Sequence, residues 1–150
     1  ALLEAYHLIG CERNGDIVSM TSYAPLLAKD RRTRWRPDLI YFNNMEVKPG
    51  TSYYTQLLFG QNSGNEYIPS VLTLSDNRDD VRKRIGISVV KDSLSQDLIL
   101  KIVNLLPVKV QATIDLAVLG ITGKQDATKT VYRDELPAYS LTVVKLKSKP

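Results

Sequence analysis

Hydrophobic and polar positions alternate along much of the second half of the chain. Residues 108–116 place Val, Val, Ala, Ile and Leu at every second position, with Lys, Gln, Thr and Asp between them. This period of two predicts a β-strand with one buried face and one wet face. The alternating run 85–89 and the apolar run 98–105 are also predicted strands. Because Pro107 lies in the short turn between 98–105 and 108–116, we expect these two strands to form an antiparallel hairpin.

Three shorter apolar runs complete this half, at 71–74, 130–132 and 141–146. In the last of them the apolar register changes between Val143 and Val144, which predicts a β-bulge. The total is about six strands with turns between them. Strands at this spacing are typical of an antiparallel β-sandwich.

The first part of the chain has a different pattern. Apolar residues recur at helical spacing near the N-terminus, and Asn14-Gly15 is a plausible helix end. Thr51 or Ser52 is expected to cap a second helix that ends at Gly60. The expected order is helix, strand, charged loop, short strand-like run and helix, at residues 1–14, 16–23, 28–38, 39–42 and 53–59.

A domain boundary is predicted near the polar, glycine-containing segment 61–65. Nine of the eleven aromatic residues fall within residues 1–67, and the period of the apolar pattern changes at the same place. Such a polar segment is typical of a linker or turn. The predicted domains are therefore 1–63 and 64–150.

Charge is concentrated in one place. Residues 29–36 hold five cationic side chains and one acidic one, so they account for the whole formal net charge of +4, and the other residues balance. A nucleic-acid-binding protein more often spreads basic residues along a face, with aromatics between them. We therefore expect no nucleic-acid partner, although a nucleic-acid-binding domain that uses this loop is one alternative.

Composition also excludes several kinds of site and structure. Cys11 is the only cysteine and His7 the only histidine, which excludes an internal disulfide and a Cys-based zinc site. We accordingly expect no metal and no cofactor. No apolar run reaches the roughly 18 residues that a membrane span needs, so none is predicted.

Four motifs stand in order along the first part of the chain: GCERNGDIV (10–18), MTSYAPLL (20–27), WRPDLIYFNN (35–44) and SYYTQLLF (52–59). Together they resemble glycoside hydrolase family 51 α-L-arabinofuranosidases near the end of their catalytic barrel. The β-rich remainder resembles the C-terminal domain of that family, and Leu136–Val143 looks like its last strand.

The resemblance implies a fold, an activity and a location. The fold would be mainly β: an antiparallel, jelly-roll-like β-sandwich at 64–150, preceded by a helix–strand–loop–helix remnant of a (β/α)₈ barrel at 1–63. The remnant cannot close a barrel, because eight strands are needed. Family members remove terminal α-L-arabinofuranosyl groups from arabinan and arabinoxylan with retention of configuration. The implied location is extracellular or periplasmic. The implied partners are an arabinose-containing polysaccharide or oligosaccharide, met through the full-length enzyme, and the missing part of the catalytic barrel.

No catalytic residue is assigned within this chain. Retaining glycosidases use two carboxylates about 5–5.5 Å apart, and the family places both upstream of the matched segments. The five glutamates of the chain show no pairing in sequence, so we expect the chain alone to be inactive. Tyr23, Trp35 and Asn43 are the candidate substrate-binding residues, because Tyr23 lies at the end of the expected last barrel strand and the loop that holds Trp35 and Asn43 follows it. The alternative is that Tyr23 and Trp35 pack at the junction of barrel and sandwich.

Two further expectations concern partners. Helix 1–10 and segment 39–42 are apolar enough to require burial, which predicts self-association or an absent neighbour. The main alternative function is a free-standing, noncatalytic β-sandwich module that binds carbohydrate or protein.

Overall fold

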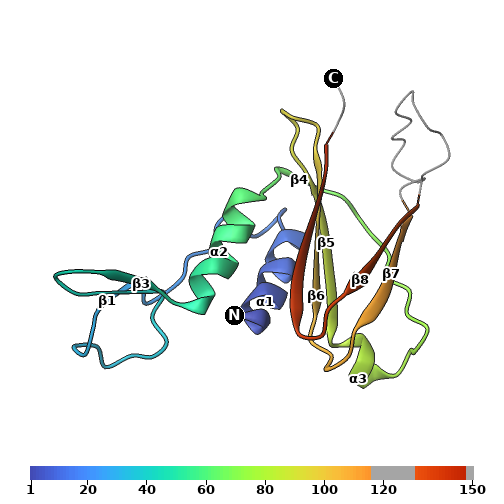
Figure 1. Ribbon diagram of the computed structural model, residues 1–150. Coiled ribbons are helices and arrows are strands. Elements are labelled where there is room, and N and C mark those ends of the chain that lie inside the picture. The colour runs from blue at the N-terminus through green and yellow to red at the C-terminus, as the bar shows by residue number, and fades with distance from the viewer. Residues whose placement is uncertain (116–130, 148–150) are drawn as a thin grey trace.

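The computed structural model describes residues 1–115 and 131–147 (Figure 1). Within them the chain is mainly β, as predicted. Residues 116 and 130, each at the end of a predicted strand, lie outside the described residues. The elements are α1 (Leu2–Arg13), β1 (Leu27–Lys29), β2 (Ile40–Phe42), β3 (Val47–Pro49), α2 (Thr51–Gln61), β4 (Glu66–Tyr67), α3 (Asp79–Arg82), β5 (Ile85–Lys91), β6 (Leu98–Asn104), β7 (Val110–Asp115), β8 (Val131–Leu136) and β9 (Ser140–Leu146).

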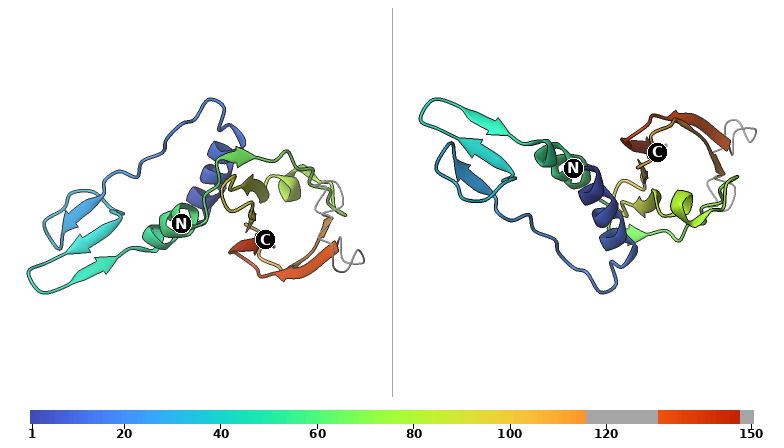
Figure 2. Two further views of the ribbon diagram at one scale, coloured as in Figure 1. Left: turned by 90° about the horizontal axis from the view of Figure 1, so that it is seen from above. Right: turned by 90° about the horizontal axis from the view of Figure 1, so that it is seen from below.

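Two antiparallel sheets form the sandwich. One has the strand order β4-β5-β6-β9, and the other consists of β7 and β8. A third sheet, β1-β2-β3, projects away from the sandwich, and the helices α1 and α2 lie between it and the four-stranded sheet (Figures 1 and 2). The predicted sandwich is thus confirmed as the second part of the chain, and the helices cover one of its faces.

The central strand β6 is buried over its whole length. Its neighbours β5 and β9 pair with it without interruption. Side chains of one parity, such as Leu98 and Leu100, form a core with Val89 on the side of the two-stranded sheet, where Ile68 and Ile114 pack against them. Side chains of the other parity face the helices. β6 therefore has two buried faces, and its sequence is a mainly apolar run, interrupted by Lys101 and Asn104, rather than an alternating one.

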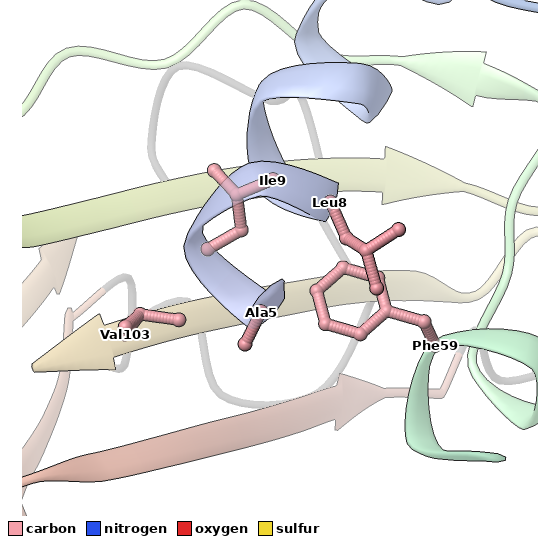
Figure 3. Close-up of a cluster of buried hydrophobic side chains, with 5 residues drawn as sticks. All are labelled: Ala5, Leu8, Ile9, Phe59 and Val103. Atoms are coloured by element: carbon pink, nitrogen blue, oxygen red, sulfur yellow. The ribbon is translucent and has the colours of Figure 1, made fainter. Parts of the chain in front are cut away.

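Helix α1 packs on the second face of this sheet (Figure 3). Its residues Ala5, Leu8 and Ile9 form a buried cluster with Val103 of β6 and Phe59 of α2. The cluster joins both helices to the sandwich, so the apolar stripe of α1 is buried within the chain itself.

A glycine in β5 makes the close approach of α1 possible. A Cβ atom built on Gly86 would lie 2.9 Å from ring atoms of Tyr6. Gly86 and Ser88 alternate with apolar residues in the sequence, yet both are buried, because α1 covers them. The alternation at 85–89 therefore places residues on the two faces of β5. One face packs in the core between the sheets and the other packs against α1.

The bulge predicted near Val143 is absent, because β9 pairs residue by residue with β6 from Ser140 to Leu146. The register change in the sequence has another cause. Leu141 packs against the cluster under α1, whereas Val144 and Leu146 pack against the core between the sheets. Both faces of β9 are therefore packed against other elements, and apolar residues occur on both.

The hairpin predicted between 98–105 and 108–116 is also wrong, because β6 and β7 belong to different sheets. Asn104 fixes this crossing. Its buried side chain donates hydrogen bonds to the carbonyls of Val108 and Pro137, at 3.0 and 2.8 Å, and accepts one from the backbone N–H of Leu106. Side-chain hydrogen bonds of this kind compete with a tight hairpin turn.

Two predicted strands do not form. Residues 16–23 have no strand beside them in the described structure, and Asn14 accepts the N–H groups of Ile17 and Val18 in a turn instead. Residues 71–74 are likewise not a strand, and Val71 is fully exposed. A strand needs paired neighbours to satisfy its backbone groups, and a short apolar run alone does not supply them.

The second helix forms as expected but begins differently. Its N-cap is Gly50, without a side-chain cap. Ser52 does not cap the helix, because its hydroxyl donates to Glu4 Oε1 of α1 at 2.8 Å and so ties the two helices together. The segment expected to be a linker is also held in place: Asn65 exchanges hydrogen bonds with Ser93 at the end of the β5–β6 hairpin.

Candidate functional site

The three predicted substrate-binding residues lie in or beside the small projecting sheet. β1 runs parallel to β2, and β2 pairs antiparallel with β3. Tyr23 is half-buried in the segment that leads into β1, Trp35 lies in the loop between β1 and β2, and Asn43 follows β2. No described hydrogen bond or ring contact joins the three side chains, so the structure places them in one region without forming a single pocket.

Asn43 makes the turn between β2 and β3. Its Oδ1 accepts the N–H groups of Met45 and Glu46 at 2.8 and 3.0 Å, and its Nδ2 donates to Glu46 Oε1. Lys48 forms an ion pair with the same carboxylate at 2.6 Å and lies 3.9 Å from Asp30. The bond from Lys48, helped by Asn43, lowers the pKa of Glu46. The turn is therefore rigidly defined by polar groups.

The segment 29–36, here called the basic loop, is held in its conformation by hydrogen bonds that start from a buried carboxylate. Asp38 is buried, and its Oδ2 lies 3.0 Å from the Thr33 hydroxyl, while its backbone N–H donates to the Tyr41 hydroxyl at 2.8 Å. The Thr33 oxygen also accepts the N–H of Trp35. The Trp35 side chain itself is 71% exposed. Within the described residues it does not pack at a junction with the sandwich.

The glutamates are dispersed over separate elements. Glu4 bonds to Ser52, Glu12 to Lys101, Glu46 to Lys48 and Glu135 to Lys109, and Glu66 is exposed on β4. Each of the first four thus has a hydroxyl or ammonium partner of its own. No arrangement of two facing glutamates is seen, and a retaining glycosidase needs two such carboxylates.

A buried polar cluster beneath α1 could not be anticipated from the sequence pattern. Lys101 of β6 has a fully buried side chain, and its Nζ lies 2.6 Å from Glu12 Oε1 of α1. Glu12 Oε2 accepts a hydrogen bond from Ser88 of β5, and the ammonium also lies over the ring of Phe59 at 5.2 Å. Burial lowers the pKa of Lys101, and the bond to Glu12 opposes that shift. The only signal in the sequence is a lysine inside an otherwise apolar strand.

An open groove of about 990 Å³ lies beside this cluster. Its walls come from the C-terminal ends of α1 and α2 and from the segments 15–21 and 63–67, and Glu12 and Phe59 both reach it. Met20, on the wall, is 83% exposed. The groove is therefore lined by a mixture of polar and apolar groups, in part from the segment that fails to form a strand.

Across 1–115 and 131–147 no three His, Cys, Asp or Glu side chains gather in a way that could hold a metal ion. Nor does this part of the chain contain a helix long and apolar enough to cross a membrane.

Comparison with known families decides the relationship. The family model described as the alpha-L-arabinofuranosidase C-terminal domain matches residues 1–142. The chain belongs to this family. The match covers both the helices and the sandwich, so the resemblance drawn from the sequence motifs is confirmed.

Individual relatives of this arabinofuranosidase domain are similar over about half of its length. An extracellular exo-α-L-arabinofuranosidase of Streptomyces chartreusis is 46% identical over 72 residues, and α-L-arabinofuranosidase 1 of Arabidopsis thaliana is 44% identical over 72 residues. Each match covers 48% of this chain. The matched segment spans 9% and 11% of those proteins, so the chain corresponds to a small part of their length.

A solved structure extends the likeness to the whole domain. The arabinose-bound α-L-arabinofuranosidase MgGH51 superposes with a TM-score of 0.69 at 26% identity. The superposition covers 97% of this chain and 25% of that protein. The fold seen here, sandwich included, is therefore that of a quarter of a glycosidase.

Proposed function

We propose that this chain is the C-terminal portion of a retaining glycosidase that removes terminal α-L-arabinofuranosyl residues from arabinan and arabinoxylan. The observation that carries the proposal is the family match over residues 1–142, together with named arabinofuranosidases among the relatives. The substrate is an arabinose-containing polysaccharide or oligosaccharide, engaged through the full-length enzyme.

Two parts of the chain have different roles in this proposal. Residues 1–63 are the end of the (β/α)₈ catalytic barrel, and residues 64–150 are the C-terminal sandwich. The end of α2 at Gln61 and the start of β4 at Glu66 support a division at this point. The exposure of Ile17 and Met20 supports the assignment of residues 1–63 to a barrel, because apolar side chains of a barrel strand are buried only when the other strands are present.

Substrate contact is assigned to Tyr23, Trp35 and Asn43. Active sites of such barrels lie at the C-terminal ends of the strands. Tyr23 ends the segment expected to be the last strand, and Trp35 and Asn43 follow it. The exposure of Trp35 supports a stacking role on a sugar ring. Asn43 contributes by shaping the turn next to it.

The chain alone is proposed to be catalytically inactive. Hydrolysis with retention needs an acid/base carboxyl and a nucleophilic carboxylate across one glycosidic bond. The dispersion of the glutamates, and the neutralisation of Glu12 by Lys101, support this proposal. The missing barrel is the required partner, and the isolated chain is expected to self-associate through the apolar surface that the barrel would cover.

The location proposed for the intact protein is extracellular or periplasmic. Its support is the name of the Streptomyces relative, which is an extracellular enzyme. Polymeric arabinan and arabinoxylan are substrates that an enzyme meets outside the cell.

The complete gene product tests the proposed activity. We expect it to hydrolyse an aryl α-L-arabinofuranoside and, by proton NMR, to release arabinose first as the α-anomer. Release of the β-anomer would contradict a retaining mechanism. Binding of arabinan without turnover would instead identify a free-standing, noncatalytic carbohydrate-binding module.

A further inference from the structure

The basic loop is the part of the chain in which positive charge is most concentrated. Its arginines 31, 32, 34 and 36 are all exposed, and none makes an ion pair among the residues that the structure describes. The one acidic residue of the loop, Asp30, faces Lys48 instead. Four guanidinium groups are thus left to solvent on six consecutive residues.

The loop is pre-organised rather than free. Its start is tied to β2 by the N–H of Asp30, which donates to the carbonyl of Phe42 at 2.8 Å. A turn follows, in which Arg32 N–H donates to the carbonyl of Lys29. At its end, the buried Asp38 holds Thr33, and Thr33 holds Trp35. Because these bonds are already made in the free chain, the loop would lose little conformational freedom when a ligand binds.

The chemistry of the exposed groups selects a ligand. A guanidinium binds a carboxylate through two parallel hydrogen bonds, which a planar carboxylate matches well. From Arg31 to Arg36 an extended chain spans at most about 18 Å, so several carboxylates on one polymer can be met together. Trp35 adds a flat apolar surface in the middle of the arginines, suited to the apolar face of a sugar ring.

We propose that the basic loop, with Trp35, is a subsite for carboxylated sugar units, that is, for uronic acid residues in the polysaccharide that carries the arabinofuranosyl groups. The inference rests on the proposed function, because family membership makes a polysaccharide the expected polymer. It adds a charge specificity that arabinose itself, which is neutral, does not require. A nucleic acid is disfavoured because the cations are confined to one loop and the other residues are balanced.

Binding of de-esterified oligogalacturonate to the 150-residue chain tests this subsite, measured by calorimetry near 0.15 M salt. We expect the methyl ester of the same oligosaccharide, which keeps the sugar but lacks the charge, to bind at least tenfold more weakly. The triple variant Arg31→Gln/Arg32→Gln/Arg34→Gln should lose at least tenfold in affinity for the acid. Trp35→Ala should weaken binding of both the acid and its ester.

The matched control removes three charges elsewhere. Arg82→Gln/Lys83→Gln/Arg84→Gln changes exposed residues at the end of α3 and beyond it, by the same net charge. We expect it to bind the acid within about twofold of the unaltered chain, since exposed charges farther apart than the Debye length of about 8 Å are largely screened. An equal loss in this control, or equal binding of acid and ester, would overturn the proposal.

Binding of a DNA duplex to the same chain is the last measurement in this test. If it binds the loop more tightly than the oligogalacturonate in the same buffer, the partner is a nucleic acid and the proposal is wrong. These outcomes are distinguishable from failure of the proposed function. Uronate binding through the loop by a gene product without arabinofuranosidase activity would refute only the activity, and activity without uronate preference would refute only the subsite.

Discussion

Lys101→Met is expected to lower the free energy of unfolding by about 3–5 kcal/mol, because it leaves the carboxylate of Glu12 partly buried and without its cation. The ammonium that is lost is fully buried and lies 2.6 Å from Glu12 Oε1, and Glu12 is 19% exposed. The double variant Lys101→Met/Glu12→Leu should recover most of the loss, since a buried ion pair can often be replaced by apolar groups at little cost. Urea unfolding of both variants measures the difference.

The exposed pair Lys109–Glu135 provides the matched control. Its side chains are 69% and 45% exposed. Lys109→Met should therefore cost no more than about 1 kcal/mol. If Lys101→Met costs as little as Lys109→Met, the ion pair under α1 does not hold the helix to the sheet.

Alkaline pH offers an independent readout of the same pair. Burial lowers the pKa of Lys101, so the folded chain releases that proton at a lower pH than the unfolded chain, whose lysine keeps the ordinary value of 10.5. Between the lowered pKa and 10.5 the unfolded state binds more protons, and stability rises with pH. The unaltered chain should thus gain stability relative to Lys101→Met as the pH increases through that window. A difference that stays constant or shrinks would contradict the assigned shift.

Phe59→Ala is expected to cost about 3–5 kcal/mol, the range for removing a buried phenylalanine ring. Phe59 is 8% exposed, and it brings α2 into the cluster formed by Ala5, Leu8, Ile9 and Val103 (Figure 3). The truncation would also remove the ring over which the Lys101 ammonium lies. Chemical unfolding monitored by circular dichroism gives the change in stability.

Leu58 is the control for Phe59, because it lies next to Phe59 on α2 but is 37% exposed. Leu58→Ala should be clearly milder than Phe59→Ala. Equal losses would show that α2 is stabilised by something other than its contact with α1 and β6.

Elements with a complete local pattern could be predicted from the sequence. Strand β7 alternates because one of its faces meets the other sheet and one meets water. Helix α1 buries Ala5, Leu8 and Ile9, which recur at helical spacing. Their patterns are fixed by neighbours that differ between the two faces. The family resemblance could also be predicted, because it rests on contiguous motifs.

The remaining features depend on partners far away in sequence. Gly86 and Ser88 have the pattern of a wet face, and only the presence of α1 makes them buried. Lys101 interrupts an apolar strand, and its meaning is clear only once Glu12 lies opposite. Segment 16–23 has strand-forming residues, but no described strand lies beside it. Local periodicity cannot show which surface covers a face or whether a pairing partner is at hand.

The candidate site also has one part that the sequence predicts and another part that only the folded chain shows. The motifs predicted that Tyr23 ends the expected last strand and that Trp35 and Asn43 follow it. The bonds that define the β2–β3 turn and the basic loop became visible only in the folded chain. Asp38, for example, has no distinctive sequence context, yet its burial organises Thr33 and, through it, Trp35.

Whether the 150-residue chain is an enzyme by itself is decided by assaying the purified chain on an aryl α-L-arabinofuranoside. We expect no turnover above the buffer blank, with activity confined to the complete gene product, because this chain holds no pair of facing glutamates. Glu12→Gln and Glu66→Gln variants accompany the assay. Turnover by the chain that persists through repurification, and that falls with either variant, would contradict the account and make this chain an enzyme in its own right.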